Sequence, residues 1–136
     1  MITVGWCEKV SLPLLNIKSM RAKIDTGART SAIHAYHVTP YSHEGQMYLS
    51  FTLHPSKNKY VPCEALMADE RVVKSSNGHM ETRYVIITPL LINGESWPIE
   101  ITLTNRDEMG FPFLLGRSAM HRRLLVNPSK RYLIQP

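Results

Sequence analysis

The sequence predicts an all-β fold with one short helix towards its C-terminal end. Short runs in which apolar and polar residues alternate follow one another along the chain, and turn residues separate them. Two Asn-Gly pairs, Asn77-Gly78 and Asn93-Gly94, stand between such runs and are typical of hairpin turns. This succession argues against a helical or βαβ fold. The 136 residues, 43% of them apolar, suffice for one core, so we expect a single domain over residues 1–136.

The first predicted strands lie on either side of residue 25. Residues 10–15 are interpreted as an edge strand, because Pro13 cannot donate a hydrogen bond to a central ladder. In residues 20–24 three apolar residues alternate with two basic ones, which predicts a half-buried strand that ends at Asp25. Residues 30–38 are again rich in β-forming residues.

Further strands and the helix are predicted in the rest of the chain. The strands are expected at residues 47–53, 61–67, 84–92 and 97–104. The second Asn-Gly pair joins the last two of them into a hairpin, and a polar loop is expected at residues 54–59. Residues 119–125 show a short helical pattern, and residues 1–4 and 131–134 are strand-like runs at the two ends.

A single carboxylate is placed at a tight turn by the sequence Asp25-Thr26-Gly27-Ala28. The hydroxyl of Thr26 can hold the turn, Gly27 allows a backbone conformation that a side chain would forbid, and Ala28 is small enough to let a second carboxylate come close. Taken alone, the triplet is also typical of an ordinary turn. A second segment, residues 113–118, argues against an ordinary turn. It holds an apolar triplet, a Gly and an Arg, and a short helical pattern follows it.

With the two segments in this order, the chain resembles a single-domain retropepsin-type aspartic protease over nearly its whole length. The resemblance implies a retropepsin-like acid protease barrel and an aspartic endopeptidase activity. It implies that Asp25, Thr26 and Gly27 form the catalytic loop, and that Gly116 and Arg117 support this loop from behind.

The resemblance also places a flap hairpin at residues 74–80. A polar hairpin that contains Gly can open and close over a groove, whereas a surface hairpin without a function is the alternative interpretation. The residues expected to bind substrate are Ala28, Arg29, Asn77, Gly78 and His79.

A narrower resemblance is carried by residues 71–83, 97–104 and 111–118. These segments are similar to a bacterial family labelled ATP-dependent zinc protease, whose members are associated with ATP-grasp glutamate ligases of the RimK type. The residues of this chain do not agree with that label, because the sequence has neither a His-Glu-x-x-His motif nor a Gly-x-x-x-x-Gly-Lys-Ser/Thr loop.

The histidines give no zinc-binding spacing. The closest pair, His34 and His37, lies in a β-rich run, where an odd spacing sends the two rings to opposite faces. We therefore expect no metal and no cofactor. A zinc hydrolase that uses His34, His37, His79 or Glu100 stays open as an alternative without a spacing signal.

The chain offers one Asp-Thr-Gly, whereas aspartic proteases use two carboxyl groups that share a proton. Half a site implies a homodimer in which Asp25 of each subunit meets its mate on the two-fold axis. The strand-like runs at residues 1–4 and 131–134 fit the terminal pieces that retropepsins interleave into a dimer sheet, and ordinary edge strands are the alternative.

Two charges are reversed relative to the viral retropepsins. Those proteins tend to follow Gly-Ala with an acidic residue and to pair it with an Arg near the partner's N-terminus, whereas the corresponding positions here are Arg29 and Glu8. An opposite-charge pair across the dimer would preserve the attraction. The alternative is two solvated charges.

The net charge of +5 bears on the substrate. Arg21, Lys23, Arg29 and Lys74 are grouped in sequence around the proposed site, and a basic groove attracts acidic chains. Together with the association with glutamate ligases, this suggests a Glu-rich peptide or a glutamyl-extended protein as substrate. A non-catalytic basic β-domain that binds RNA or ribosomal protein is the alternative. Nucleic acid is not expected as a partner, because aromatic residues do not interleave regularly with Lys and Arg along the chain.

The cell compartment is expected to be the cytoplasm. The first residues lack a signal-peptide pattern, and no segment approaches the length of a membrane span. Two cysteines, Cys7 and Cys63, are too few for a disulfide framework and are interpreted as half-buried thiols in a reducing compartment.

Overall fold

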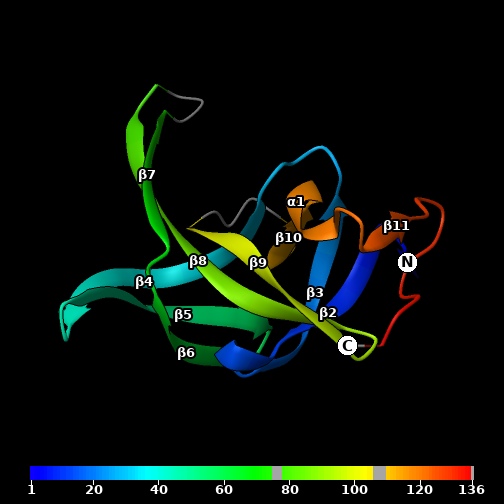
Figure 1. Ribbon diagram of the computed structural model, residues 1–136, viewed down its shortest axis with the longest axis horizontal. Helices are drawn as coiled ribbons and strands as arrows, with labels where there is room; N and C mark the ends of the chain where they lie inside the picture. Colours follow the sequence, from blue (N-terminus) through cyan, green and yellow to red (C-terminus); the bar gives the residue numbers. More distant parts are fainter. Residues whose placement is uncertain (75–77, 106–109, 136) are drawn as a thin grey trace.

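The computed structural model of the chain describes residues 1–74, 78–105 and 110–135 (Figure 1). Its strands are β1 (Ile2–Val4), β2 (Cys7–Leu12), β3 (Ile17–Asp25), β4 (Ser31–His43), β5 (Gln46–Ser56), β6 (Lys59–Leu66), β7 (Asp69–Lys74), β8 (Met80–Ile92), β9 (Glu95–Thr104), β10 (Phe113–Gly116) and β11 (Leu124–Val126). The described ranges also contain a 3-10 helix, η1 (Pro13–Leu15), and one helical turn, α1 (Arg117–Met120). The prediction of an all-β fold with one short C-terminal helix is confirmed.

Six of the strands close into a barrel. Neighbouring strands follow the order β10, β3, β2, β8, β9 and β4, and β4 pairs again with β10. β10 runs parallel to β3 on one side and antiparallel to β4 on the other. Beyond β4 the sheet continues into β5 and β6, and β7 pairs with the first residues of β8. The four residues of β10 are therefore the piece that completes the ring.

Alternation along the strands produces the barrel interior. In β3, Met20, Ala22 and Ile24 are buried, and Arg21 and Lys23 between them are exposed, as the sequence pattern predicts. Each of the six wall strands contributes fully buried apolar side chains, among them Leu12, Met20, Ile33, Ile86, Ile101 and Phe113. None of the helices in the described ranges has the length and apolar character needed to cross a bilayer.

The longest strands change partners along their length. Residues Ser31 to His34 of β4 pair with β9, and β4 pairs with β5 from Ala35 onwards. A bulge between Tyr36 and Thr39 separates most of the β5 pairing from the barrel part of the strand. The arm that β4 and β5 form then projects from the barrel (Figure 1).

Both predicted hairpins are present. β8 and β9 are joined by Asn93 and Gly94, whose φ angles of 50° and 79° fit the turn that an Asn-Gly pair favours. β7 and β8 form the second hairpin, whose tip at residues 75–77 lies outside the described residues. The loop expected at residues 54–59 is shorter than predicted, because β5 continues to Ser56 and β6 begins at Lys59.

Two expectations about local structure are wrong. Residues 10–15 are not an edge strand, because β2 lies between β3 and β8 and ends before Pro13, which begins η1 instead. Proline is tolerated there because the first N–H groups of a helix have no partner within it. The helical pattern at residues 119–125 is also only partly realised: α1 ends at Met120, and β11 follows.

The two ends of the chain are held within the chain itself. β1 pairs in parallel with β11, and residues 131–134 form no strand. Instead, the C-terminal segment follows β2: the backbone N–H of Tyr132 donates to the carbonyl of Cys7 at 3.0 Å, and that of Trp6 donates to Lys130 at 2.8 Å. Within the described chain, β1 and β11 thus form a two-stranded sheet of their own, and residues 131–134 lie beside β2 without forming a strand.

Both cysteines are free thiols and are more deeply buried than expected. Cys7 is 2% exposed and Cys63 is 6% exposed. The Sγ atom of Cys7 donates to the hydroxyl of Tyr132 at 3.6 Å. Burial raises the pKa of Cys63 to about 11. These thiols are core residues, not half-buried ones.

Candidate active site

The carboxylate of Asp25 lies half-buried at the end of β3, in a turn that leads to β4. Its Oδ1 atom accepts a hydrogen bond from the backbone N–H of Gly27 at 3.0 Å, and its carbonyl accepts one from Ala28 at 3.3 Å. A Cβ atom at Gly27 would lie 3.2 Å from that carboxylate oxygen. The turn therefore presents the carboxylate in one orientation at the mouth of the loop.

Two details of this turn differ from the sequence interpretation. Gly27 does not have a positive φ, so glycine serves here to leave room beside the carboxylate and not to reach a left-handed conformation. Thr26 is exposed, and within the described residues its hydroxyl makes no hydrogen bond; its carbonyl is the group that is held.

β10 and the start of α1 hold the loop from behind. Gly116 is paired with Asp25, and its N–H donates to the hydroxyl of Ser31 at 3.0 Å. A Cβ atom at Gly116 would lie 2.6 Å from the carbonyl carbon of Thr30, so only glycine lets the two segments approach this closely.

The neighbouring arginine binds the loop through its carbonyl groups. The Nη1 atom of Arg117 donates to the carbonyl of Gly27 at 3.2 Å and lies 3.5 Å from that of Thr26. Its backbone N–H donates to Ala28 at 2.8 Å, and that of Ser118 donates to Arg29 at 3.0 Å. The loop carbonyls are therefore the partners of the Arg117 guanidinium group.

The β7–β8 hairpin extends beside this loop (Figure 1). Gly78 has a φ of 86°, and His79 beside it is exposed. Asn77 lies outside the described residues.

A cavity of about 250 Å³ lies between the hairpin and the barrel. Its lining residues come from the end of the Asp25 loop, from β4, β7, β8, β9 and β10: Thr30, Ser31, Ala32, Arg71, Val73, Arg83, Thr102, Thr104 and Leu114. The two arginines lie directly opposite each other in the β7–β8 pair. Like charges opposite each other destabilise a sheet unless other groups compensate them.

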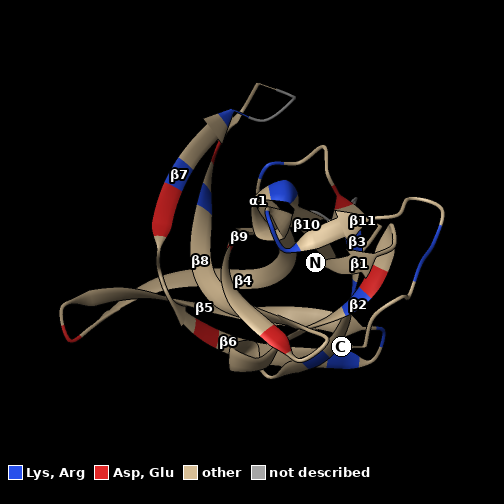
Figure 2. Ribbon diagram, turned by 45° about the vertical axis from the view of Figure 1, so that its right-hand side comes forward, with Lys and Arg blue, Asp and Glu red and all other residues tan. Residues whose placement is uncertain are grey.

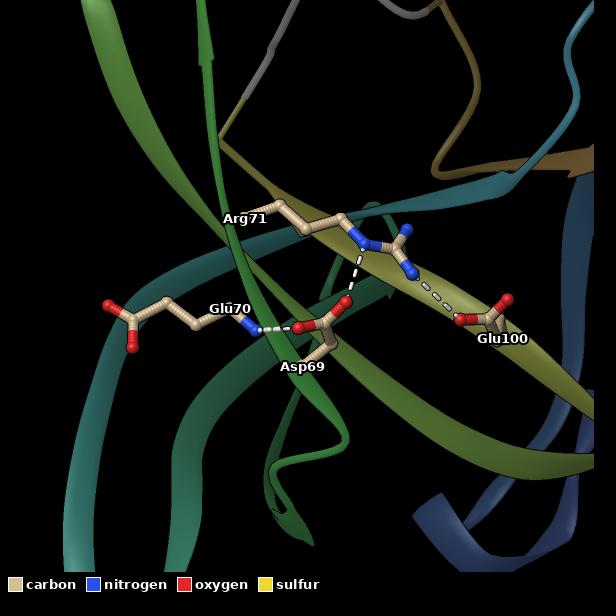
Figure 3. A network of polar contacts seen from close by, with 4 residues as sticks. All are labelled: Asp69, Glu70, Arg71 and Glu100. Carbon is tan, nitrogen blue, oxygen red and sulfur yellow. Dashed lines mark hydrogen bonds and ion pairs between the residues drawn. The ribbon is translucent and has the colours of Figure 1, made fainter.

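Carboxylates compensate both arginines. Arg71 donates to Asp69 at 2.7 Å and to Glu100 at 3.0 Å (Figure 3). The hydrogen bond from Arg71, with a second from the backbone of Glu70, lowers the pKa of the Asp69 carboxyl. Arg83 donates to Glu81 at 2.8 Å. Two guanidinium groups are thus held at the wall of the cavity.

Sequence reasoning proposed a different set of basic residues. Arg21 and Lys23 lie on the outer face of β3, and Arg21 lines another cavity. Arg29 lines a pocket with Arg117, Ser118 and His121, and Lys74 is exposed at the end of β7. The four residues are close in sequence to the proposed site but do not form one groove. Arg71 and Arg83 were missed, because both lie outside the hairpin predicted at residues 74–80 and no alternation marks the face on which they lie.

The proposed pair of Glu8 and Arg29 across a dimer is contradicted by the structure. Glu8 is fully buried, and its carboxylate accepts hydrogen bonds from the backbone N–H groups of Gly5, Leu133 and Ile134 at 2.7, 2.9 and 3.2 Å. Arg29 is exposed. Glu8 is therefore neither an intersubunit partner nor a solvated charge but an anchor for the C-terminal segment.

The two neighbouring histidines of β4 are placed differently. His34 is buried, and its ring contacts Tyr36 edge to face with the centroids 4.4 Å apart. His37 is exposed and has a φ of 53°. In the part of the chain that the structure describes, no three His, Cys, Asp or Glu side chains are grouped in a way that could hold a metal ion.

A closed β-barrel with an Asp-Thr-Gly loop, a Gly-Arg segment behind it and a hairpin beside it defines a retropepsin-like protein. Comparison with known families gives the same class. The model of the RimB-like family, described as retropepsin-like aspartic endopeptidase RimB, matches residues 3–136, and the chain belongs to this family.

Curated relatives from bacteria are similar over most of the chain. Proteins named probable alpha-L-glutamate ligase from Shewanella halifaxensis and Parasynechococcus marenigrum are each 44% identical to it, over 132 and 130 residues. These matches cover 95% and 93% of this chain but 28% of each relative, so the chain spans little more than a quarter of their length.

A solved structure has the same fold. The crystal structure of a protein of unknown function from Legionella pneumophila is 29% identical in sequence, with a TM-score of 0.82 over 97% of both chains.

Proposed function

We propose that this chain is an aspartic peptidase in which Asp25 is a catalytic residue. The observation that carries the proposal is the held carboxylate: the Gly27 N–H orients it, and Gly116 and Arg117 fix the loop that carries it. The family is named for an aspartic endopeptidase, which agrees with this role. Thr26 and Gly27 shape the loop, and Ala28 leaves space in front of it.

The reaction needs a second carboxyl group, which a homodimer supplies. Two Asp25 side chains about 3 Å apart cannot both ionise, so the pair holds one proton. The ionised group removes a proton from a water molecule, whose oxygen attacks the peptide carbonyl carbon, and the protonated group donates to the carbonyl oxygen. Collapse of this intermediate breaks the C–N bond, and the leaving amine takes up a proton.

The exposure of the loop supports this assembly. Thr26 and Gly27 are exposed, and Asp25 is half-buried, so a second copy can approach them along a two-fold axis. The contact that brings the two Asp25 loops together would lie at the loop end of the barrel.

The cavity beside the loop supports an acidic peptide or a glutamyl-extended protein as substrate. Arg71 and Arg83 both line it, and the N–H groups that they do not donate to Asp69, Glu100 and Glu81 can bind a carboxylate side chain of the substrate. The hairpin with Gly78 and His79 would cover the bound chain, with Arg29 at the other end of the loop. Relatives named probable alpha-L-glutamate ligase agree with this class of substrate.

The mechanism is tested by Asp25→Asn, which keeps the size of the side chain and removes the shared proton. Peptide cleavage should fall to background, and the thermal unfolding midpoint should stay within a few degrees of the original. A chelator should leave cleavage by the unchanged protein intact. Cleavage that survives Asp25→Asn but disappears with the chelator would instead identify a zinc hydrolase.

The assembly is tested by measuring the specific activity and the sedimentation coefficient over the same concentration range. Both should rise together as dimer forms, because each monomer carries half of the site. Adding Asp25→Asn protein in excess should suppress the activity of the unchanged protein by forming mixed dimers. A monomer whose activity is proportional to its concentration would exclude the shared site.

A further inference from the structure

A second and larger cavity lies on the outer wall of the barrel, at the opposite end of β10 from Gly116. Its volume is about 750 Å³. Five segments line it: the outer faces of β2 and β3, the first half of β4, the end of β5 with the turn to β6, and the residues just before β10. Arg21 on its wall is four residues before Asp25, which is roughly 13 Å along a strand. The cavity is therefore separate from the proposed active site.

The charged residues that line this cavity are all basic. Lys9 and Arg21 are direct neighbours in the β2–β3 pair, and Lys57 reaches the cavity from the β5–β6 turn. No Asp or Glu is among its described lining residues. Figure 2 shows acidic residues on β7, β6 and β9, at the β4–β5 turn and on β2, where Glu8 is fully buried, and basic residues on β2 and along the C-terminal segment. Such a site attracts anions.

Aromatic rings support two of these cations. The guanidinium group of Arg21 lies 4.5 Å from the centre of the Phe111 ring, and the ammonium group of Lys9 lies 5.5 Å from that of Tyr132. Arg21 also donates to the carbonyl of Gly110 at 3.3 Å. These contacts hold the positive charges at the rim of the cavity.

Two aromatic side chains, Tyr36 and His54, line one side of the cavity, and Tyr60 lies beyond them against His54. His54 stacks on Tyr60 with the ring centres 4.1 Å apart and the planes 13° apart. The ring of Tyr36 lies 6.4 Å from that of His54 and 6.3 Å from that of Tyr60. Tyr60 is 62% exposed, so these rings continue onto the open surface.

We propose that this cavity binds single-stranded nucleic acid. An unpaired base would stack on the wall formed by Tyr36, His54 and Tyr60, and the adjoining phosphates would lie at Lys9, Arg21 and Lys57. Aromatic platforms beside a basic groove are the two parts of such a site. An acidic peptide would use the cations but has no flat base to place against the aromatic rings, and a duplex would present phosphates without an unpaired base.

The fold explains why the sequence pattern indicated the opposite, that nucleic acid is not a partner. Along the chain, aromatic residues do not interleave with Lys and Arg, but the rings come from β4, β5 and β6 and the cations from β2, β3 and the β5–β6 turn. Only the bending of β4 away from the barrel brings these segments together.

Fluorescence anisotropy with a fluorescein-labelled ten-nucleotide oligouridylate tests the proposal. The full chain should bind it at low salt, and the affinity should fall as salt rises. Lys57→Glu should weaken binding roughly tenfold, whereas Arg122→Glu, the same charge change at an exposed site beyond α1, should change it less than twofold. Tyr60→Leu should weaken binding by about fivefold or more, because it removes one stacking face.

A second tyrosine provides the matched control for stacking. Tyr48→Leu removes a ring that stacks on Tyr41 in the projecting arm and should leave binding unchanged. Asp25→Asn should also bind normally, which separates this site from the peptidase. Deoxyoligothymidylate of the same length shows whether the site contacts the 2′-hydroxyl group. Equal binding of both oligonucleotides and preferential binding of one of them both support a single-strand site.

Several results would overturn the proposal. One is the absence of oligouridylate binding at low salt. Another is an equal loss of affinity in Lys57→Glu and Arg122→Glu, or in Tyr60→Leu and Tyr48→Leu. Tight binding of labelled decaglutamate that does not depend on Tyr60 would identify a docking site for acidic polypeptide instead. Equal affinity for a duplex of the same length would show that no unpaired base is recognised.

Discussion

Replacing Glu8 by Gln should lower the free energy of unfolding by about 3 kcal/mol. One carboxylate oxygen accepts from Gly5 and Leu133 and the other from Ile134, all within a fully buried site. An amide has a single acceptor oxygen, so its NH2 group must face a backbone donor. A lost hydrogen bond to a charged group costs about 1.5–3 kcal/mol, and an unsatisfied buried donor costs about 1–3 kcal/mol.

The assay is thermal unfolding of the two proteins with a matched control. For a domain of this size the entropy of unfolding is about 0.3 kcal/mol per degree, so the midpoint should fall by roughly 10 °C. Glu95→Gln, at an exposed carboxylate, should leave it within about 1 °C. Trypsin should also cut more rapidly at Lys130 and Arg131. An unfolding midpoint of Glu8→Gln equal to that of the control would refute the role of Glu8 as an anchor for the C-terminal segment. A weaker dimer with an unchanged midpoint would instead support a pair of Glu8 and Arg29 between subunits.

The other predictions concern the loop, a buried thiol and the substrate. Gly116→Ala should abolish cleavage and lower the unfolding midpoint, because its Cβ would lie 2.6 Å from the carbonyl carbon of Thr30; an unchanged kcat would contradict this. Cys63 in the folded chain should resist iodoacetamide at pH 8, since a pKa of about 11 leaves on the order of 0.1% thiolate. Because the folded thiol keeps its proton while the unfolded one loses it, stability should fall between about pH 9 and 11, as a pH series of denaturant melts would show. Arg83→Ala should raise KM for acidic peptides more than for neutral ones, and salt should slow cleavage of the acidic peptides more; equal effects on both would remove the acidic preference.

The strands and hairpins could be predicted from the sequence where strands that are neighbours in the sheet are also neighbours along the chain. The alternation in β3 fixed both the buried face and the end of the strand at Asp25. The Asn93-Gly94 turn fixed the register of β8 and β9. The proposed role of the loop was inferred from two short segments, residues 25–28 and 113–118. Few residue types are tolerated there, since Gly116, for example, has no room for a side chain.

The errors arose where distant segments meet. Glu8 looks like a surface charge because its partners at residues 133 and 134 lie 125 and 126 positions away. β1 and β11 pair across most of the chain, and no local pattern marks that contact. Arg71 and Arg83 were missed because they line the cavity only on account of the face that the hairpin turns towards the Asp25 loop.

Because β10 closes the barrel, the Asp25 loop gains its support only late in synthesis. The groups that hold the Asp25 loop come about 90 residues after it, so during synthesis the loop, β4 and the β7–β8 hairpin all leave the ribosome before their support exists. Until then β3 and β4 lack a common neighbour, and the loop carbonyls lack their guanidinium partner. If Asp25 acts as proposed, a nascent chain carries the carboxylate without the contacts that orient its loop, and peptide cleavage begins only after β10 and Arg117 have left the ribosome.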